Sequence, residues 1–246
     1  MELTFSKRSQ RIKEGIFSLL NTKKEELLKE GRTVYNFSVG TPDFEPPVHI
    51  MEAMQKACGI PENYRYALTD RPELLEAVQG FYQKRFGVVL KPEQIMSLYG
   101  SQEGMAHIAL PLCDPGDIFL APDPGYPVFS IGPELTGAEC VTYPLYPENN
   151  FLPDFDDILE GTAKRAKFML ISYPANPVCS VADDEFYERA IAFAEKYQII
   201  LLHDNAYADL VYGGKTGKSF LSYPGAMDVG IEFFSLSKSY NMTGMR

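Results

Sequence analysis

The sequence predicts an α/β protein in which helices cover both faces of a mostly parallel β-sheet. Two observations support this fold class. Short, continuously apolar runs alternate with helical patterns, as expected for strands that are buried on both faces. Polar and aromatic residues follow directly after most of these runs, where open parallel sheets bind their ligands. The expected strands are 95–99, 118–121, 140–143, 168–172, 199–203 and 233–236.

The first part of the chain has a different pattern. Residues 8–30 combine helix formers with an apolar stripe that Gly31 ends, which predicts a helical arm packed on another surface. Residues 34–39 alternate like a strand, and the proline-rich segment 40–47 predicts an ordered loop or a linker.

The composition limits the partners of this chain. Its 246 residues, of which 45% are hydrophobic, suffice for a large core. A formal net charge of -10 disfavours nucleic acid as a partner. No apolar stretch reaches the roughly 20 residues of a membrane helix, and the charged N-terminus does not resemble a signal peptide. We therefore expect a cytoplasmic protein with no membrane partner. The four cysteines and three histidines lack metal spacing, so no metal site is predicted.

A lysine near the end of the chain is the most informative residue. Lys238 follows an apolar run, lies among serines and threonines, and precedes Arg246. An amine beside hydroxyls and an arginine could hold an aldehyde as a Schiff base next to a phosphate. Pyridoxal phosphate is a cofactor that carries both an aldehyde and a phosphate. A single lysine is more often a solvated surface charge, so assigning this cofactor to Lys238 depends on the residues around it.

The ends of the other expected strands offer the remaining groups that this cofactor needs. Asp204 could keep the ring nitrogen protonated, and the adjacent His203 could either orient that carboxylate or be a packed core histidine. Asn176 and Tyr207 could hydrogen-bond the ring oxygen, while Tyr126 could stack on the ring. The candidates for the phosphate are Ser101, Gln102, Ser235 and Arg246. Taken singly, each residue could be a cap, a turn former or part of the core.

The order of these motifs resembles the class I and II aminotransferases of pyridoxal-phosphate fold type I. The matching motifs are Asp-Pro-Gly-Tyr-Pro (123–127), Tyr-Pro-Ala-Asn-Pro (173–177), Asp-x-x-Tyr (204–207) and Ser-x-x-Lys (235–238). Segments 100–107, 123–128 and 148–154 look most like LL-diaminopimelate aminotransferases. The resemblance implies that Lys238 forms the internal aldimine with pyridoxal 5'-phosphate and moves the substrate proton. Asp204 and Tyr207 would share in catalysis.

The same resemblance implies a substrate contact, a partner subunit and a domain division. Segment 37–44 is similar to the family's N-terminal Gly-x-Pro-Asp-Phe loop, in which Gly40 would lie against the substrate carboxylate. Tyr66 takes the place of a tyrosine that reaches the phosphate of the neighbouring subunit, so a homodimer is implied. The arm and part of a small domain would occupy 1–45, and an incomplete cofactor-binding large domain 46–246. The family's C-terminal small domain would be absent.

The implied reaction moves an amino group between an amino acid and a 2-oxo acid, but the substrates stay open. Gln102 stands where lysine is usual, Val178-Cys179 stands where Thr-Gly is usual, and loop 69–72 lacks a common glycine. Carbon–sulfur β-elimination at the same cofactor site is one alternative. A non-catalytic ligand-sensing module is another. Because the family continues well past the cofactor arginine, we expect a fragment or a short form that is inactive alone.

Overall fold

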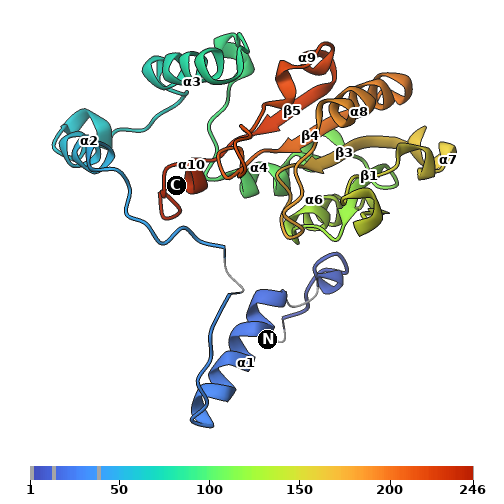
Figure 1. The fold of residues 1–246 in the computed structure, drawn as a ribbon, viewed down its shortest axis with the longest axis horizontal. Helices are drawn as coiled ribbons and strands as arrows, with labels where there is room; N and C mark the ends of the chain where they lie inside the picture. Colours follow the sequence, from blue (N-terminus) through green and yellow to red (C-terminus); the bar gives the residue numbers. More distant parts are fainter. Residues whose placement is uncertain (1–2, 13–14, 38–39, 246) are drawn as a thin grey trace.

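The computed structural model describes residues 3–12, 15–37 and 40–245, with a parallel five-stranded sheet at its centre (Figure 1). The strand order is β2-β1-β3-β4-β5, and every neighbouring pair is parallel. The strands are β1 Ile118–Asp123, β2 Glu139–Pro144, β3 Ala166–Ser172, β4 Ile200–Asp204 and β5 Gly230–Phe233. The predicted fold class is confirmed.

Helices cover both faces of this sheet (Figure 1). Successive strand residues face opposite sides, so β3 sends Met169 and Ile171 towards one layer and Leu170 towards the other. The first layer contains α8 Asp184–Tyr197 and α9 Ala226–Val229. The second contains α4 Ser101–His107 and α6 Val128–Thr136. Strands buried on both faces explain the continuous apolar runs in the sequence.

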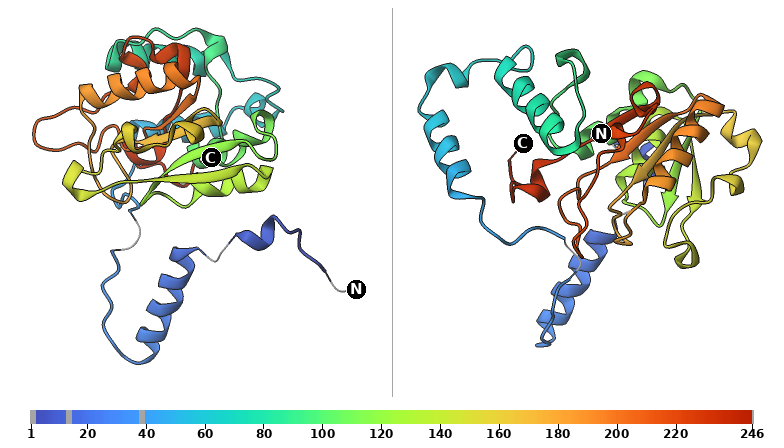
Figure 2. Two further views of the ribbon diagram at one scale, coloured as in Figure 1. Left: turned by 90° about the vertical axis from the view of Figure 1, so that its right-hand side faces the viewer. Right: turned by 45° about the horizontal axis from the view of Figure 1, so that its top comes forward.

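The N-terminal helices lie outside this body (Figure 2). Helices α1 Ile16–Lys29 and α2 Val48–Cys58 contain no buried residue. The predicted arm is thus helical, and its contacts with the body include the Arg8 guanidinium, which donates to the Leu135 carbonyl at 2.9 Å. Helix α3 Pro72–Phe86 is better anchored, because Tyr82 packs on Phe234.

Short helical segments complete the described chain. They are η1 Ser9–Arg11, η2 Pro61–Tyr64, η3 Pro92–Gln94, α5 Ala109–Leu112, η4 Pro147–Asn149, η5 Phe155–Asp157, α7 Glu160–Ala163, η6 Phe220–Ser222 and α10 Leu236–Ser239. None of the helices in the described ranges combines the length and apolarity needed to cross a bilayer.

Three strand predictions differ from the structure. Residues 95–99 form no strand, and the Ser97 N–H donates to the Asp70 carboxylate at 2.9 Å instead of to a neighbouring strand. The last strand ends at Phe233, because Ser235 begins α10 by accepting a hydrogen bond from the Ser237 N–H at 3.1 Å. Residues 34–37 form no strand, while 38–39 lie outside the described residues. An apolar run becomes a strand only where another strand pairs with its backbone groups.

Candidate active site

The carboxyl ends of β3, β4 and β5 meet at one edge of the sheet and place three segments together. Ser172 of β3 pairs in register with Asp204 of β4, and Asp204 pairs with Phe233 of β5. The chain continues from these ends into loop 173–180, the turn at 206–209 and helix α10. This is the edge at which parallel sheets bind ligands.

Asp204 is a buried acid at the end of β4. It is 6% exposed, and its Oδ1 accepts a hydrogen bond from the Ala206 N–H at 3.2 Å. Burial raises the pKa of Asp204 to about 6, although the Ala206 N–H and the charges of His203 and Lys238 act in the opposite direction. A carboxylate held in such surroundings is suited to bind a cationic N–H group.

Lys238, on α10, contacts a residue from a distant part of the chain. Its Nζ donates to the Gly40 carbonyl at 3.0 Å, although 198 residues separate the two. The same Nζ lies 5.6 Å from the centroid of the Tyr207 ring. The structure therefore brings together Lys238, Tyr207 and Gly40, three of the residues that the sequence singled out.

Tyr207 connects the segments that follow β3 and β4. The Asn176 side-chain amide donates to the Tyr207 hydroxyl at 3.5 Å. Burial raises the pKa of Tyr207, and the negative charge of Asp204 raises it further. The phenol therefore stays protonated near neutral pH and can donate a hydrogen bond to a ligand oxygen.

Tyr126 and Gln102 face one another at the second helical layer. The Tyr126 hydroxyl donates to the Gln102 Oε1 at 3.4 Å. Ser101 begins α4 directly after Gly100, whose φ of 92° favours glycine. Gly104 allows α4 to approach β5, because a Cβ there would lie 2.6 Å from the Phe233 ring. Both glycines therefore shape the start of α4 and its packing on β5.

Two other predicted residues lie elsewhere in the described chain. Ser235 lies between β5 and α10 as the N-cap described above. Tyr66 is 98% exposed, so the described chain buries almost none of its side chain. Arg246 lies outside the described residues.

His203 does not orient Asp204, because it faces the other side of the sheet. Its Nδ1 lies 2.9 Å from a Glu232 carboxylate oxygen, and its Nε2 lies 3.0 Å from the Tyr173 carbonyl. The structure therefore supports the reading of His203 as a packed core histidine. The sequence reasoning did not single out Glu232, although an isolated acid inside the apolar run 231–234 was an available signal.

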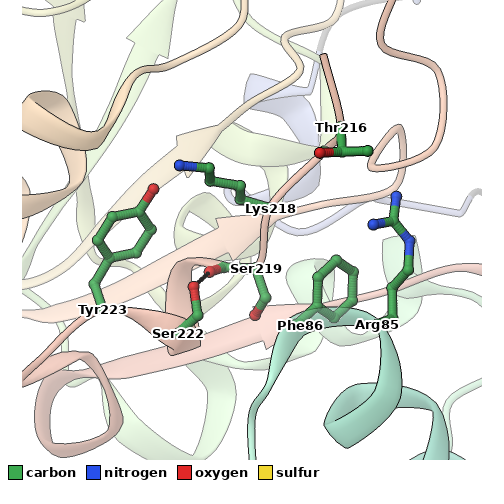
Figure 3. Close-up of a pocket in the computed structure, with 8 residues that line it drawn as sticks. Arg85, Phe86, Thr216, Lys218, Ser219, Ser222 and Tyr223 are labelled. Atoms are coloured by element: carbon green, nitrogen blue, oxygen red, sulfur yellow. Dashed lines mark hydrogen bonds between the residues drawn. The ribbon is translucent and has the colours of Figure 1, made fainter. Parts of the chain in front are cut away.

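A separate cavity of about 280 Å³ lies between α3 and the segment before η6 (Figure 3). It shares no lining residue with the group around Lys238. Both of its cations have carboxylate partners: Arg85 lies 3.0 Å from Asp209, and Lys218 pairs with Asp184. Within the described chain, no group of three or more His, Cys, Asp or Glu residues is placed to hold a metal ion.

The family model of aminotransferase class I and II matches residues 32–246. The LL-diaminopimelate aminotransferase of Aquifex aeolicus is 44% identical over 244 residues, which cover 98% of this chain and 63% of that protein. The corresponding enzyme of Syntrophobacter fumaroxidans is 43% identical over 94% of the chain and 60% of its own length. The chain therefore spans less than two thirds of these curated relatives.

Solved structures also match nearly all of this chain over less than two thirds of their own length. The chain matches apo-BacF from Bacillus subtilis with a TM-score of 0.92 and 38% identity, covering 99% of this chain and 62% of that one. It matches a probable N-succinyldiaminopimelate aminotransferase from Thermus thermophilus with a TM-score of 0.87 and 35% identity, covering 94% and 62%.

Proposed function

The chain belongs to the class I and II aminotransferases, and on this premise we propose that the complete protein transfers an amino group between an amino acid and a 2-oxo acid with pyridoxal 5'-phosphate. The observation that carries the proposal is the meeting of the Lys238 amine, the buried Asp204 carboxylate and the Tyr207 phenol at one edge of the sheet. These three groups come from α10, the end of β4 and the turn that follows it.

The residues at this edge fit pyridoxal phosphate. Asp204 would pair with the ring nitrogen, since few protein groups hydrogen-bond this buried carboxylate. Asn176 and Tyr207 would hold the ring oxygen, and Tyr126 would lie against the ring. The groups proposed for the phosphate are Ser101, Gln102, Ser235 and Arg246. When bound, the cofactor would supply an electron sink for the α-carbon of the substrate.

Lys238 would bind the aldehyde through Nζ and would later remove and return the α-proton of the substrate as a general base. The Nζ donates to the Gly40 carbonyl at 3.0 Å, a contact that would help to orient the amine. This contact supports the proposal that Gly40 would lie near the substrate carboxylate.

We also propose a homodimer in the cytoplasm, with an N-terminal unit over 1–45 and the cofactor-binding domain over 46–246. Two observations support the dimer. Tyr66 is 98% exposed, as expected of a residue that serves a neighbouring subunit. Helices α1 and α2 bury none of their residues within the described chain, so their apolar side chains keep surface that a second copy could cover.

The relatives give a first substrate to test. The enzymes of Aquifex aeolicus and Syntrophobacter fumaroxidans are named for LL-diaminopimelate, so we propose this diamino acid as the first amino donor to assay. Gln102, at the start of α4, lacks the charge of the lysine that is usual there, and Gln102→Lys tests whether this difference changes the choice of acceptor.

The decisive experiment traps the cofactor on the complete protein. Borohydride reduction in the presence of pyridoxal phosphate, followed by peptide mass spectrometry, should place the adduct on Lys238. The variant Lys238→Ala should lose the adduct and all amino transfer. An adduct on another lysine, or transfer that survives in Lys238→Ala, would exclude the proposal. Keto-acid-independent release of pyruvate from a sulfur-containing amino acid would instead indicate a lyase.

A further inference from the structure

Two polar side chains lie side by side at the end of the sheet. Ser172 is the last residue of β3, and its register partner on β4 is Asp204. Residues paired across neighbouring strands lie about 5 Å apart, and their side chains stand on the same face. Alternation along the strands places both on the face that α4 and α6 cover, together with Leu170 and Leu202.

The Ser172 hydroxyl is a buried polar group without a protein partner. Ser172 is 6% exposed, and its Oγ has no hydrogen-bond partner within the described part of the chain. The buried Ser219 hydroxyl, by contrast, donates to Glu232 at 2.9 Å. A buried hydroxyl that remains unpaired is unfavourable and uncommon in native proteins.

Asp204 offers the missing acceptor. A carboxylate can accept about four hydrogen bonds, whereas in the described chain Asp204 receives one, from the Ala206 N–H. The staggered positions of a serine hydroxyl differ by rotation about one bond, so Ser172 can turn its hydroxyl towards the neighbouring strand without moving the backbone.

From this juxtaposition we propose that Ser172 is a positioning residue, whose hydroxyl donates a hydrogen bond to the Asp204 carboxylate and keeps it ionised and fixed opposite the cofactor's ring nitrogen. The inference rests on the proposed function, because it takes Asp204 as the partner of the cofactor's ring nitrogen. Ser172 would act through Asp204 and not through contact with the substrate.

The proposed hydrogen bond would change the balance between the protonated and the ionised form of Asp204. A hydrogen bond to the ionised carboxylate favours that form and counteracts the burial that raises the pKa of Asp204. The charged groups that act on Asp204 are His203, on the same strand, and Lys238, on α10. Neither is on β3, so Ser172 supplies its stabilisation from a different direction.

The first test measures cofactor binding by the complete protein. Cofactor-free wild type and Ser172→Ala are titrated with pyridoxal phosphate and with its analogue that carries CH in place of the ring nitrogen. Ser172→Ala should weaken pyridoxal phosphate about 10-fold, the effect of one hydrogen bond to a charged group, and should leave the analogue within about 2-fold. Equal weakening of both ligands, or of neither, overturns the proposal.

Two further variants control this test. Ser172→Thr keeps the hydroxyl and should restore the affinity for pyridoxal phosphate. Ser222→Ala removes a hydroxyl that donates to the Ser219 carbonyl at 2.6 Å on η6, and it should leave both affinities unchanged. Failure of the threonine variant to bind better than the alanine variant would contradict the role of the hydroxyl.

The second test needs no cofactor. The pKa of Asp204 is measured by carboxyl ¹³C NMR in the cofactor-free protein, with Asp204→Asn to assign the signal. Ser172→Ala should raise this pKa by about one unit, and an unchanged pKa overturns the proposal. Wild type that does not bind pyridoxal phosphate would contradict the proposed function, whereas the NMR result judges Ser172 independently.

Discussion

His203 and Asp204 are consecutive residues of β4, both are buried, and their surroundings differ completely. Both nitrogens of His203 have partners, a Glu232 oxygen at 2.9 Å and the Tyr173 carbonyl at 3.0 Å. Asp204, on the opposite face, receives a single hydrogen bond from the described chain. Successive residues of a strand face opposite sides of the sheet, so neighbours in the sequence can have very different numbers of hydrogen-bond partners.

The His203 face is completed by Glu232, whose side chain is fully buried. This carboxylate accepts hydrogen bonds from Tyr82 and Ser219, each at 2.9 Å, and from the Phe220 N–H at 3.0 Å. One acid of β5 therefore binds α3, η6 and β4. A buried acid with a full set of partners can thus hold several elements together, whereas Asp204, with one partner, keeps acceptor capacity that the proposed cofactor would use.

Removing Glu232 should have the largest effect on stability. Glu232→Ala leaves His203, Tyr82 and Ser219 without their shared acceptor and should lower the free energy of unfolding by about 3–5 kcal/mol. Urea denaturation of the complete protein measures this loss. Glu232→Gln, which keeps the size and one acceptor, should lose less. A loss below about 1 kcal/mol for the alanine variant would show that the buried acid does not hold these elements together.

Neutralising Asp204 should have a smaller effect of the opposite sign. Its folded-state pKa of about 6 lies above the ordinary 3.8, so the folded protein binds this proton more tightly than the unfolded chain. The contribution of Asp204 to stability is therefore favourable at low pH and is lost as the pH rises through about 6. Asp204→Asn should raise the free energy of unfolding of the cofactor-free protein by about 1–2 kcal/mol at pH 8.

The pH dependence supplies the control for this prediction. The difference between Asp204→Asn and wild type should shrink when urea denaturation is repeated at about pH 3, below the ordinary pKa of 3.8, where the wild-type carboxyl is mostly protonated in both states. If Asp204→Asn is less stable than wild type at pH 8, the ionised Asp204 carboxylate has more stabilising partners in the folded protein than the single Ala206 N–H.

The smallest expected effects on stability come from two tyrosines that lie beside Glu232 and His203. Tyr82 donates to Glu232 at 2.9 Å, whereas the Tyr187 hydroxyl lies 3.5 Å from His203. Tyr82→Phe should cost about 1–2 kcal/mol, and Tyr187→Phe about 0.5 kcal/mol or less, because the longer contact is weaker. Thermal unfolding of both variants gives the order, and a reversed order would show that the Glu232 carboxylate is not the centre of the network.

Much of the fold and of the candidate site could be predicted from the sequence. Four of the expected strands lie close to their predicted positions, since apolar runs between helical patterns report burial on both faces. Asp204, Asn176 and Tyr207 follow those runs in the sequence. Because the carboxyl ends of parallel strands meet at one edge of the sheet, their closeness in space could be expected. Membership of the family was already visible in the order of the motifs.

Only the tertiary structure decided which side of the sheet each side chain occupies and which residues it contacts. Residues 95–99 remained irregular because no described strand pairs with them, and the Lys238 contact with Gly40 joins parts of the chain that are far apart. The same holds for His203 with Glu232 and for Ser172 beside Asp204, which depend on register between strands. Local sequence determines which segments become helices and strands, whereas register and face arise from long-range pairing and decide which polar groups are satisfied.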